Sequence, residues 1–291
     1  VRHTRTIMAV DSLARSGAIK KAPKLFGKQG FLSPWIMAFA GSAMLYFRCM
    51  HLEQPPTIYL IVLIKATPIF ILFALTLELT QHGASARYAK AVGRGLLCSA
   101  AGDIFLDFEG AFKHDGLFIG GLLSFLVAHL FYLVAFGIGM KFADIRQDVA
   151  APLALYGLSL FAYLIVYVPS TLVLPVFVYA SVIASMAITA ICRPLPAAPT
   201  GAAAPAGGAA SSGLAATWSL YSGSVGALIF VVSDSVLAVN KFAFAVPSGK
   251  DILMATYYAG QLGIALSCWG AWEPTPPAEP SAAQKEAKKT K

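Results

Sequence analysis

Eight long apolar runs limit the folds open to this chain more than any other feature. A bilayer core about 30 Å thick is crossed by roughly 20 apolar residues in a helix, and each run approaches that length. The eight runs are residues 31–50, 57–77, 92–108, 117–139, 151–168, 171–192, 217–239 and 252–271. Hydrophobic residues make up 57% of the chain and charged residues only 12%, unlike a soluble globular domain. The sequence therefore predicts an all-α, polytopic integral membrane protein, a bundle of eight transmembrane helices.

Lysine and arginine lie mainly on one side of this predicted bundle. With the N-terminus on the inner side, the inner segments hold 17 of the 22 Lys and Arg residues, the outer segments hold 4, and Lys65 lies within a span. Positive residues favour the cytoplasmic side, so both termini are predicted to be cytoplasmic. Basic flanks of this kind face anionic lipid. The net charge of +8 therefore gives no reason to expect a nucleic acid partner.

The predicted organisation has three parts. A basic cytoplasmic arm, residues 1–30, precedes the transmembrane domain, residues 31–272, and a Lys-rich disordered cytoplasmic tail follows, residues 273–291. Within the domain, residues 193–216 are rich in Pro, Ala, Gly and Ser and predict a flexible loop. The tail ends in KKTK, which resembles the dilysine signal of endoplasmic reticulum membrane proteins. A Lys-rich end that is merely solvated is the alternative.

Polar and ionisable side chains occur inside five of the predicted spans. Asp103 and Asp107 are four residues apart and share one helix face, and Tyr257 and Gln261 do the same. An Asp or Lys at a helix centre costs about 2.5–3.5 kcal/mol, so these groups are expected to meet one another or a water-filled cavity. The complete set is Lys65, Asp103, Asp107, His129, Tyr132, Ser233, Asp234, Asn240, Tyr257 and Gln261.

Structural roles compete with functional ones for these residues. A Lys paired with two Asp can neutralise charge and fix helix register, and a single intramembrane His can donate to a neighbouring carbonyl. The tyrosines can be packing or interfacial residues. Zinc hydrolases need three protein ligands, and of the five His residues only His129 falls in a predicted span. We therefore expect no metal site and no cofactor.

Four segments resemble the YhhN family of membrane proteins, whose eukaryotic branch is the transmembrane protein 86 group of lysoplasmalogenases. The segments are GDIFLDF, GGLLSFLVAHLFYLVAF, FVVSDSVLAVNKF and TYYAGQL. The Lys-x-x-Pro of Lys65 and Pro68 approximates the Lys-Pro of that family, and the resemblance covers about residues 57–270. It implies an enzyme that hydrolyses the vinyl ether of lysoplasmalogens to a fatty aldehyde and glycerophosphocholine or glycerophosphoethanolamine. Its partners are then a lysophospholipid from the bilayer and water.

Vinyl ether hydrolysis gives the intramembrane carboxylates a chemical role. Protonation of the outer alkene carbon makes an oxocarbenium ion, to which water adds, so the reaction needs an acid, a positioned water and negative charge. Two carboxylates in unlike environments supply these roles in glycosidases. We hypothesise that Asp103 and Asp234 form the pair, because each follows a small residue, Gly102 or Ser233, that would let a substrate approach. Lys65 would hold one carboxylate ionised, and either Asp can be the acid. The remaining polar residues of the set are expected to orient water or contact the head group.

A transporter is the alternative from a different functional class. Intramembrane Asp, Lys and His are also what a proton-coupled transporter or a lipid-moving protein would use. The motif GDxxL beginning at Gly102 and the motif SDxxL beginning at Ser233 hint at an internal repeat such as transporters have. A transporter would leave its substrate chemically unchanged, whereas an enzyme would turn over in detergent.

Overall fold

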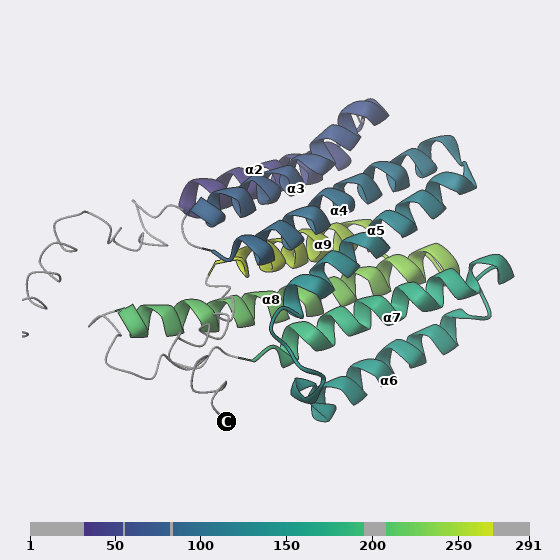
Figure 1. The fold of residues 1–291 in the computed structure, drawn as a ribbon. Helices are drawn as coiled ribbons and strands as arrows, with labels where there is room; N and C mark the ends of the chain where they lie inside the picture. The colour runs from purple at the N-terminus through teal and green to yellow at the C-terminus, as the bar shows by residue number, and fades with distance from the viewer. Residues whose placement is uncertain (1–31, 55, 82–83, 195–207, 270–291) are drawn as a thin grey trace, which may run out of the picture. The chain divides into compact units, whose positions relative to one another are not determined.

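The computed structural model describes residues 32–54, 56–81, 84–194 and 208–269. Within them the chain forms eight α-helices, a short 3-10 turn and a π-helical segment, and no strand (Figure 1). Residues 1–37 and 38–291 form two units, and all contacts among α3 to α9 lie within the second. The predicted arm and tail fall outside the described residues. The elements are α2 (Leu32–Met50), α3 (Ile58–Gln81), α4 (Ala86–Phe112), α5 (Asp115–Phe136), η1 (Phe142–Asp144), α6 (Gln147–Leu164), α7 (Ser170–Cys192), α8 (Gly208–Ala238), η2 (Val239–Ala243) and α9 (Gly249–Leu266).

Each of the eight predicted runs corresponds to one helix, which confirms the all-α prediction. Two helices begin six or more residues before the predicted apolar run, α4 at residue 86 and α8 at residue 208. The start of α4 is set by Ser85, whose hydroxyl accepts the backbone N–H of Tyr88 at 3.1 Å, and such a cap satisfies an otherwise unpaired helix donor. The other is α8, which begins at Gly208. The last part of the predicted loop 193–216 is therefore helical.

Four helical segments of the described chain are long and apolar enough to cross a membrane: Ile58–Gln81, Gly116–Phe136, Ser170–Cys192 and Thr217–Ala243. The other four helices do not meet the same criterion. For α4 the reason is its charge, because Lys90, Arg94, Asp103 and Asp107 all lie within it. The fold is therefore that of an all-α, multi-pass integral membrane protein.

Helices that follow one another in the chain mostly pack side by side. The pairs α3 with α4, α4 with α5, α6 with α7, α7 with α8 and α8 with α9 are all in contact. In addition, α7 packs on α5, while α9 returns to lie against α3 and α4 (Figure 1). The last helix of the described chain thus packs on α8 and also reaches α3 and α4, to which its Tyr257 and Tyr258 donate hydrogen bonds.

The contact between α8 and α9 is a backbone-to-backbone approach. A Cβ atom at Gly263 would lie 2.7 Å from the Gly226 Cα, and a Cβ atom at Gly226 would lie 2.8 Å from the Gly260 carbonyl oxygen. Real Cβ atoms do not come this close. Small residues let helices in a membrane approach in this way, so that van der Waals packing holds them together.

A second anchor lies where α7 ends. The guanidinium of Arg193 donates to the Tyr88 hydroxyl and to the Ser219 carbonyl, both at 2.6 Å, and it lies over the rings of Tyr88 and Phe136. The Ser219 hydroxyl donates in turn to the carbonyl of Ser267. Arg193 therefore links the end of α7 to the start of α4, the end of α5 and the backbone of α8, and through Ser219 to the end of α9.

We predict that Gly263→Val destabilises the protein by about 3 kcal/mol or more, because the new side chain meets backbone that cannot move aside. Thermal unfolding of the detergent-purified protein measures the loss. A Cβ atom at Gly110 would meet nothing within 4 Å, so Gly110→Val is the matched control. Equal midpoints for the two variants would show that α8 and α9 do not rely on this approach.

Candidate active site

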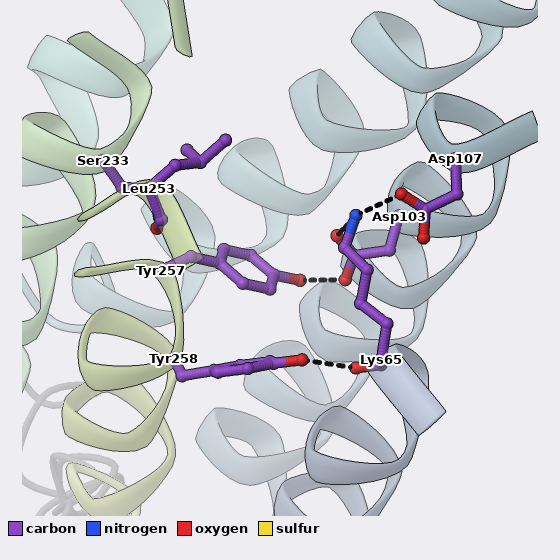
Figure 2. Close-up of polar contacts among 7 residues, drawn as sticks. All are labelled: Lys65, Asp103, Asp107, Ser233, Leu253, Tyr257 and Tyr258. Atoms are coloured by element: carbon purple, nitrogen blue, oxygen red, sulfur yellow. Dashed lines mark hydrogen bonds and ion pairs between the residues drawn. The ribbon is translucent and has the colours of Figure 1, made fainter. Parts of the chain in front are cut away.

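A buried ion cluster joins α3 and α4. The Lys65 ammonium lies 2.8 Å from Asp107 Oδ1 and 3.5 Å from Asp103 Oδ1 (Figure 2). The exposed fractions of the Lys65, Asp103 and Asp107 side chains are only 8%, 5% and 16%. We call these three residues the Lys65 cluster. Their meeting agrees with the expectation that intramembrane charges compensate one another, since an isolated buried charge is costly.

Two tyrosines of α9 complete the surroundings of this cluster. The Tyr257 hydroxyl donates to Asp103 Oδ2 at 2.6 Å, and the Tyr258 hydroxyl donates to the backbone carbonyl of Lys65 at 2.9 Å (Figure 2). Pro68 lies within the same turn of α3 and has no N–H to donate. Both phenols point from α9 toward α3 and α4, so the last helix holds the charged residues of two earlier ones.

A second polar set, the Asp234 triad, consists of Asp234 on α8, Tyr179 on α7 and His129 on α5. The Tyr179 hydroxyl donates to Asp234 Oδ2, and His129 Nε2 lies 4.0 Å from the same oxygen. His129 is fully buried, and neither ring nitrogen makes a hydrogen bond of normal geometry to the described residues. The polar groups nearest to the ring are the Asp234 carboxylate and the Phe125 backbone carbonyl, one turn earlier on α5. The imidazole therefore has unused hydrogen-bonding capacity, as do the Tyr46 hydroxyl, Asp107 Oδ2 and Gln261 Nε2.

Tyr132 and Gln261 form a third polar contact, between α5 and α9. The Tyr132 hydroxyl donates to Gln261 Oε1 at 2.7 Å and lies 3.4 Å from the Ser99 hydroxyl. The Tyr132 ring covers Gly95, where a Cβ atom would lie only 2.2 Å from it. These residues therefore fix the packing of α4, α5 and α9 about one helical turn away from the two acidic sets.

Aromatic rings separate the Lys65 cluster from the Asp234 triad. The Tyr257 ring packs on Phe230 and Phe125 with centroid distances of 5.6 and 6.0 Å, and Phe230 packs on His129 at 4.8 Å. Asp103 and Asp234 thus belong to different hydrogen-bonded sets that are joined by edge-to-face aromatic contacts. Asp103 and Asp234 therefore do not form one directly bonded pair, as the hypothesis supposed, but lie in two neighbouring polar sets.

Asp234 also lies in the wall of an apolar groove between α5, α6, α7 and α8. The groove encloses about 950 Å³, including its open mouth. Its lining is mainly aliphatic and aromatic, and the polar side chains in it are those of Asp234, Tyr179, Tyr156, Ser235 and Lys241. The Tyr156 hydroxyl on α6 donates to the Ser235 hydroxyl on α8 at 2.8 Å. An apolar groove with a few convergent polar groups has the form of a small-molecule site.

Two predicted supporting residues bind backbone instead of facing the groove. The Ser233 hydroxyl donates to the Leu253 carbonyl at 3.2 Å (Figure 2), and Asn240 Oδ1 accepts the Val246 N–H at 3.1 Å. Gly102 does not leave room for a substrate as expected, because a Cβ atom there would lie 2.6 Å from the Phe125 ring. The small residues before the two aspartates therefore serve helix packing.

Tyr179 belongs to the candidate site, and the sequence analysis missed it. It stands in a continuous apolar run, where a tyrosine is usually a packing residue. The signal in the sequence is weak: a buried phenol needs a hydrogen-bond partner, and the sequence does not show which one. Among the described residues, no three His, Cys, Asp or Glu side chains gather closely enough to hold a metal ion.

The sequence pattern of the YhhN family matches residues 60–268. The chain belongs to the YhhN family. Among its relatives, lysoplasmalogenase TMEM86A of Bos taurus is 31% identical over 246 residues, covering 83% of this chain and 91% of that protein. Lysoplasmalogenase TMEM86B of Sus scrofa is 29% identical over 250 residues, with 86% and 92% covered. A lysoplasmalogenase homolog of Dictyostelium discoideum is 28% identical over 201 residues, with 62% and 63% covered. No solved structure matches the chain significantly.

The expected resemblance to this family is thus confirmed. All three acidic residues of the two polar sets lie within the matched range, and so do Lys65, His129 and Tyr179. The region 195–207, between α7 and α8, lies outside the described residues and contains no residue of the candidate site.

We predict that Lys65→Met destabilises the protein by about 3–5 kcal/mol, because it leaves two buried carboxylates without their cation. Unfolding in detergent measures this loss. The double variant Lys65→Met/Asp107→Asn removes one of the stranded charges and should regain part of it. If the single variant were as stable as the natural protein, charge compensation would not be what holds α3 against α4.

Proposed function

We propose that this protein is a lysoplasmalogenase that hydrolyses the vinyl ether of lysoplasmalogens. The products are a fatty aldehyde and glycerophosphocholine or glycerophosphoethanolamine. The relatives that bear this name cover most of the chain. The observation that carries the proposal is the position of Asp234, a carboxyl group in the wall of an otherwise apolar groove.

The groove fits the alkenyl chain of a single-chain lipid. Leu122, Leu160 and Ile183 supply apolar surface from three different helices, and burying hydrocarbon against such surface is favourable by about 25 cal/mol per Å². A lipid that lies along the groove brings its vinyl ether, at the polar end of the chain, to Asp234. A membrane protein can take such a substrate directly from the bilayer, so no soluble domain is needed.

Asp234 is the acid in this proposal. Its polar neighbours are the Tyr179 phenol and the His129 ring, and burial without a fixed cation favours the protonated carboxyl. The Asp234 proton goes to the outer alkene carbon, and the positive charge that forms is shared by the inner carbon and the ether oxygen. The Asp234 carboxylate then stabilises this cation and accepts a proton from the attacking water.

His129 positions that water. Its Nε2 lies 4.0 Å from Asp234 Oδ2, too far for a direct hydrogen bond. A water that bridges the imidazole and the carboxylate satisfies both groups. It adds to the carbon bearing the oxygen, and the hemiacetal collapses as its hydroxyl proton passes to the departing glycerol oxygen. One water is consumed, and Asp234 is protonated again.

Asp103 is the ionised carboxylate of the predicted pair. Lys65 lies against it and Asp107, so the Lys65 cluster carries one more negative than positive charge when both carboxyls are ionised. Negative charge fixed in a low-dielectric interior stabilises a cation that develops nearby. Tyr257 binds Asp103 and packs on the rings beside the groove, which holds this charge in place.

We predict that Asp234→Asn lowers aldehyde release from lysoplasmenylethanolamine by about 10²–10⁴-fold, the usual contribution of a general acid. Asp103→Asn should lower it less, because Asp103 acts across the aromatic layer. Release from detergent-purified protein is measured against the saturated-ether lipid, which lacks the reactive double bond.

Asp148→Asn is the matched control for these two variants. The Asp148 side chain is 66% exposed, and its hydrogen bonds to Arg146 lower the pKa of its carboxyl. This variant should keep full activity. Full activity in Asp234→Asn would remove that residue from the mechanism, and an intact protein that releases no aldehyde at all would favour transport.

We also propose the finer topology, with eight spans and both termini cytoplasmic, in the endoplasmic reticulum membrane. The distribution of Lys and Arg supports this topology. The turn between α4 and α5, which contains Lys113, then faces the lumen, and the turn between α5 and α6, which contains Lys141, faces the cytosol.

We predict opposite accessibility for these two turns. In sealed microsomes a membrane-impermeant thiol reagent should label Lys141→Cys at once and Lys113→Cys only after permeabilisation. The reverse pattern would invert the topology. Labelling of both turns from one side would show that α5 does not cross the membrane.

A further inference from the structure

An ion pair stands at the mouth of the groove. Lys241 lies in η2, directly after α8, and its side chain lines the groove. Its ammonium lies 3.0 Å from Glu109 Oε1 on α4 and 4.5 Å from the centroid of the Phe118 ring. The exposed fractions of the two charged side chains are 35% and 23%. The pair is thus half-buried and presents both signs of charge next to an aromatic face.

The spacing of Lys241 and Asp234 along the helix is close to the spacing of the phosphate and the vinyl ether in the substrate. Lys241 follows Asp234 by seven residues, which is about two helical turns or roughly 10 Å along the axis. In a lysoplasmalogen, seven bonds separate the outer alkene carbon from the phosphorus. An extended chain gains about 3.8 Å in three bonds, so this separation is roughly 8–9 Å. A lipid whose vinyl ether meets Asp234 therefore places its phosphate beside Lys241.

We propose that Lys241 and Glu109 recognise the zwitterionic head group of the substrate, the phosphate at Lys241 and the ammonium at Glu109. This inference rests on the proposed function and assigns the specificity of the same site. The two protein charges part from each other, and each takes the opposite charge of the lipid. Because every charge has a partner before and after the lipid binds, the desolvation cost is small. It would be much larger if Lys241 or Glu109 were left buried without a partner.

The surroundings of the pair favour a zwitterion over a simple phosphate. A phosphate alone would take Lys241 and leave Glu109 half-buried without a cation, which opposes binding. Movement of the Lys241 ammonium toward a phosphate also frees the face of Phe118. A substituted ammonium group binds well over such a ring. The mouth therefore offers one anionic and one aromatic surface to the amine and one cationic group to the phosphate.

The test compares three vinyl ether substrates that share one alkenyl chain: lysoplasmenylethanolamine, alkenylglycerol phosphate, which lacks the amine, and alkenylglycerol, which lacks the phosphate as well. The variants are Lys241→Met and Glu109→Gln, with Lys113→Met as the matched control, because Lys113 is an exposed lysine of the neighbouring turn that does not line the groove. The readout is kcat/KM for aldehyde release by each protein on each substrate.

For the natural protein, lysoplasmenylethanolamine should be the best of the three substrates. In Lys241→Met, the kcat/KM for lysoplasmenylethanolamine relative to that for alkenylglycerol should fall by about tenfold, mainly because KM for lysoplasmenylethanolamine rises. Glu109→Gln should lower the preference for lysoplasmenylethanolamine over alkenylglycerol phosphate by a similar factor. Lys113→Met should leave all three ratios unchanged.

A purely structural ion pair gives a different result. The charge-swapped variant Lys241→Glu/Glu109→Lys keeps an attractive pair between η2 and α4, so it should restore stability but not the natural head-group preference. Equal losses on all three substrates, or full recovery of the preference by the swap, would overturn the proposal. Absence of aldehyde from every substrate with the natural protein would instead overturn the proposed function.

Discussion

The ammonium group of Lys65 lies among helices that offer it almost no water, and it stays there because α4 places two carboxylates against it. Their spacing of one helical turn fixes the register between α3 and α4. Tyr257 and Tyr258 add hydrogen bonds from α9, which brings the end of the chain to its first half. The buried charge thus determines where three helices lie, and α5 and α8, which carry His129 and Asp234, pack against α4 and α9.

The aromatic layer gives the two acidic sets different surroundings. On one side, Asp103 meets a fixed cation, which favours an ionised carboxylate. On the other, Asp234 meets a phenol and an imidazole beside an apolar groove, and no fixed cation of the described chain lies against it, which favours a protonated one. The rings of Phe125, Phe230 and Tyr257 pack between the two carboxyl groups and exclude water, so each carboxyl keeps its own surroundings. Two chemically identical side chains can therefore carry opposite roles in one reaction.

The sequence predicts that the intramembrane charges meet, because an unpaired charge in lipid is costly and the i, i+4 spacing puts Asp103 and Asp107 on one helix face. It also predicts the eight helices, because each apolar run has the length that a membrane-spanning helix needs. The position of Tyr179 does not follow from the sequence, since a lone tyrosine in an apolar run gives no partner. Nor does the role of Ser233 or Asn240, because a backbone partner leaves no trace in the sequence. The groove depends on how α6 packs on α7, which no local pattern encodes.

The outer wall of the groove has a consequence for how such an enzyme works. In the described chain α6 packs mainly on α7 and η2, and Tyr156 joins it to α8 through a single hydroxyl pair. A lipid that enters beside α6 from the bilayer diffuses in two dimensions, so its mole fraction in the bilayer governs its rate of capture. Cleavage then divides one amphiphile into an aldehyde that remains in the membrane and a head group that dissolves in water. Neither product keeps the amphiphilic form that binds in the groove.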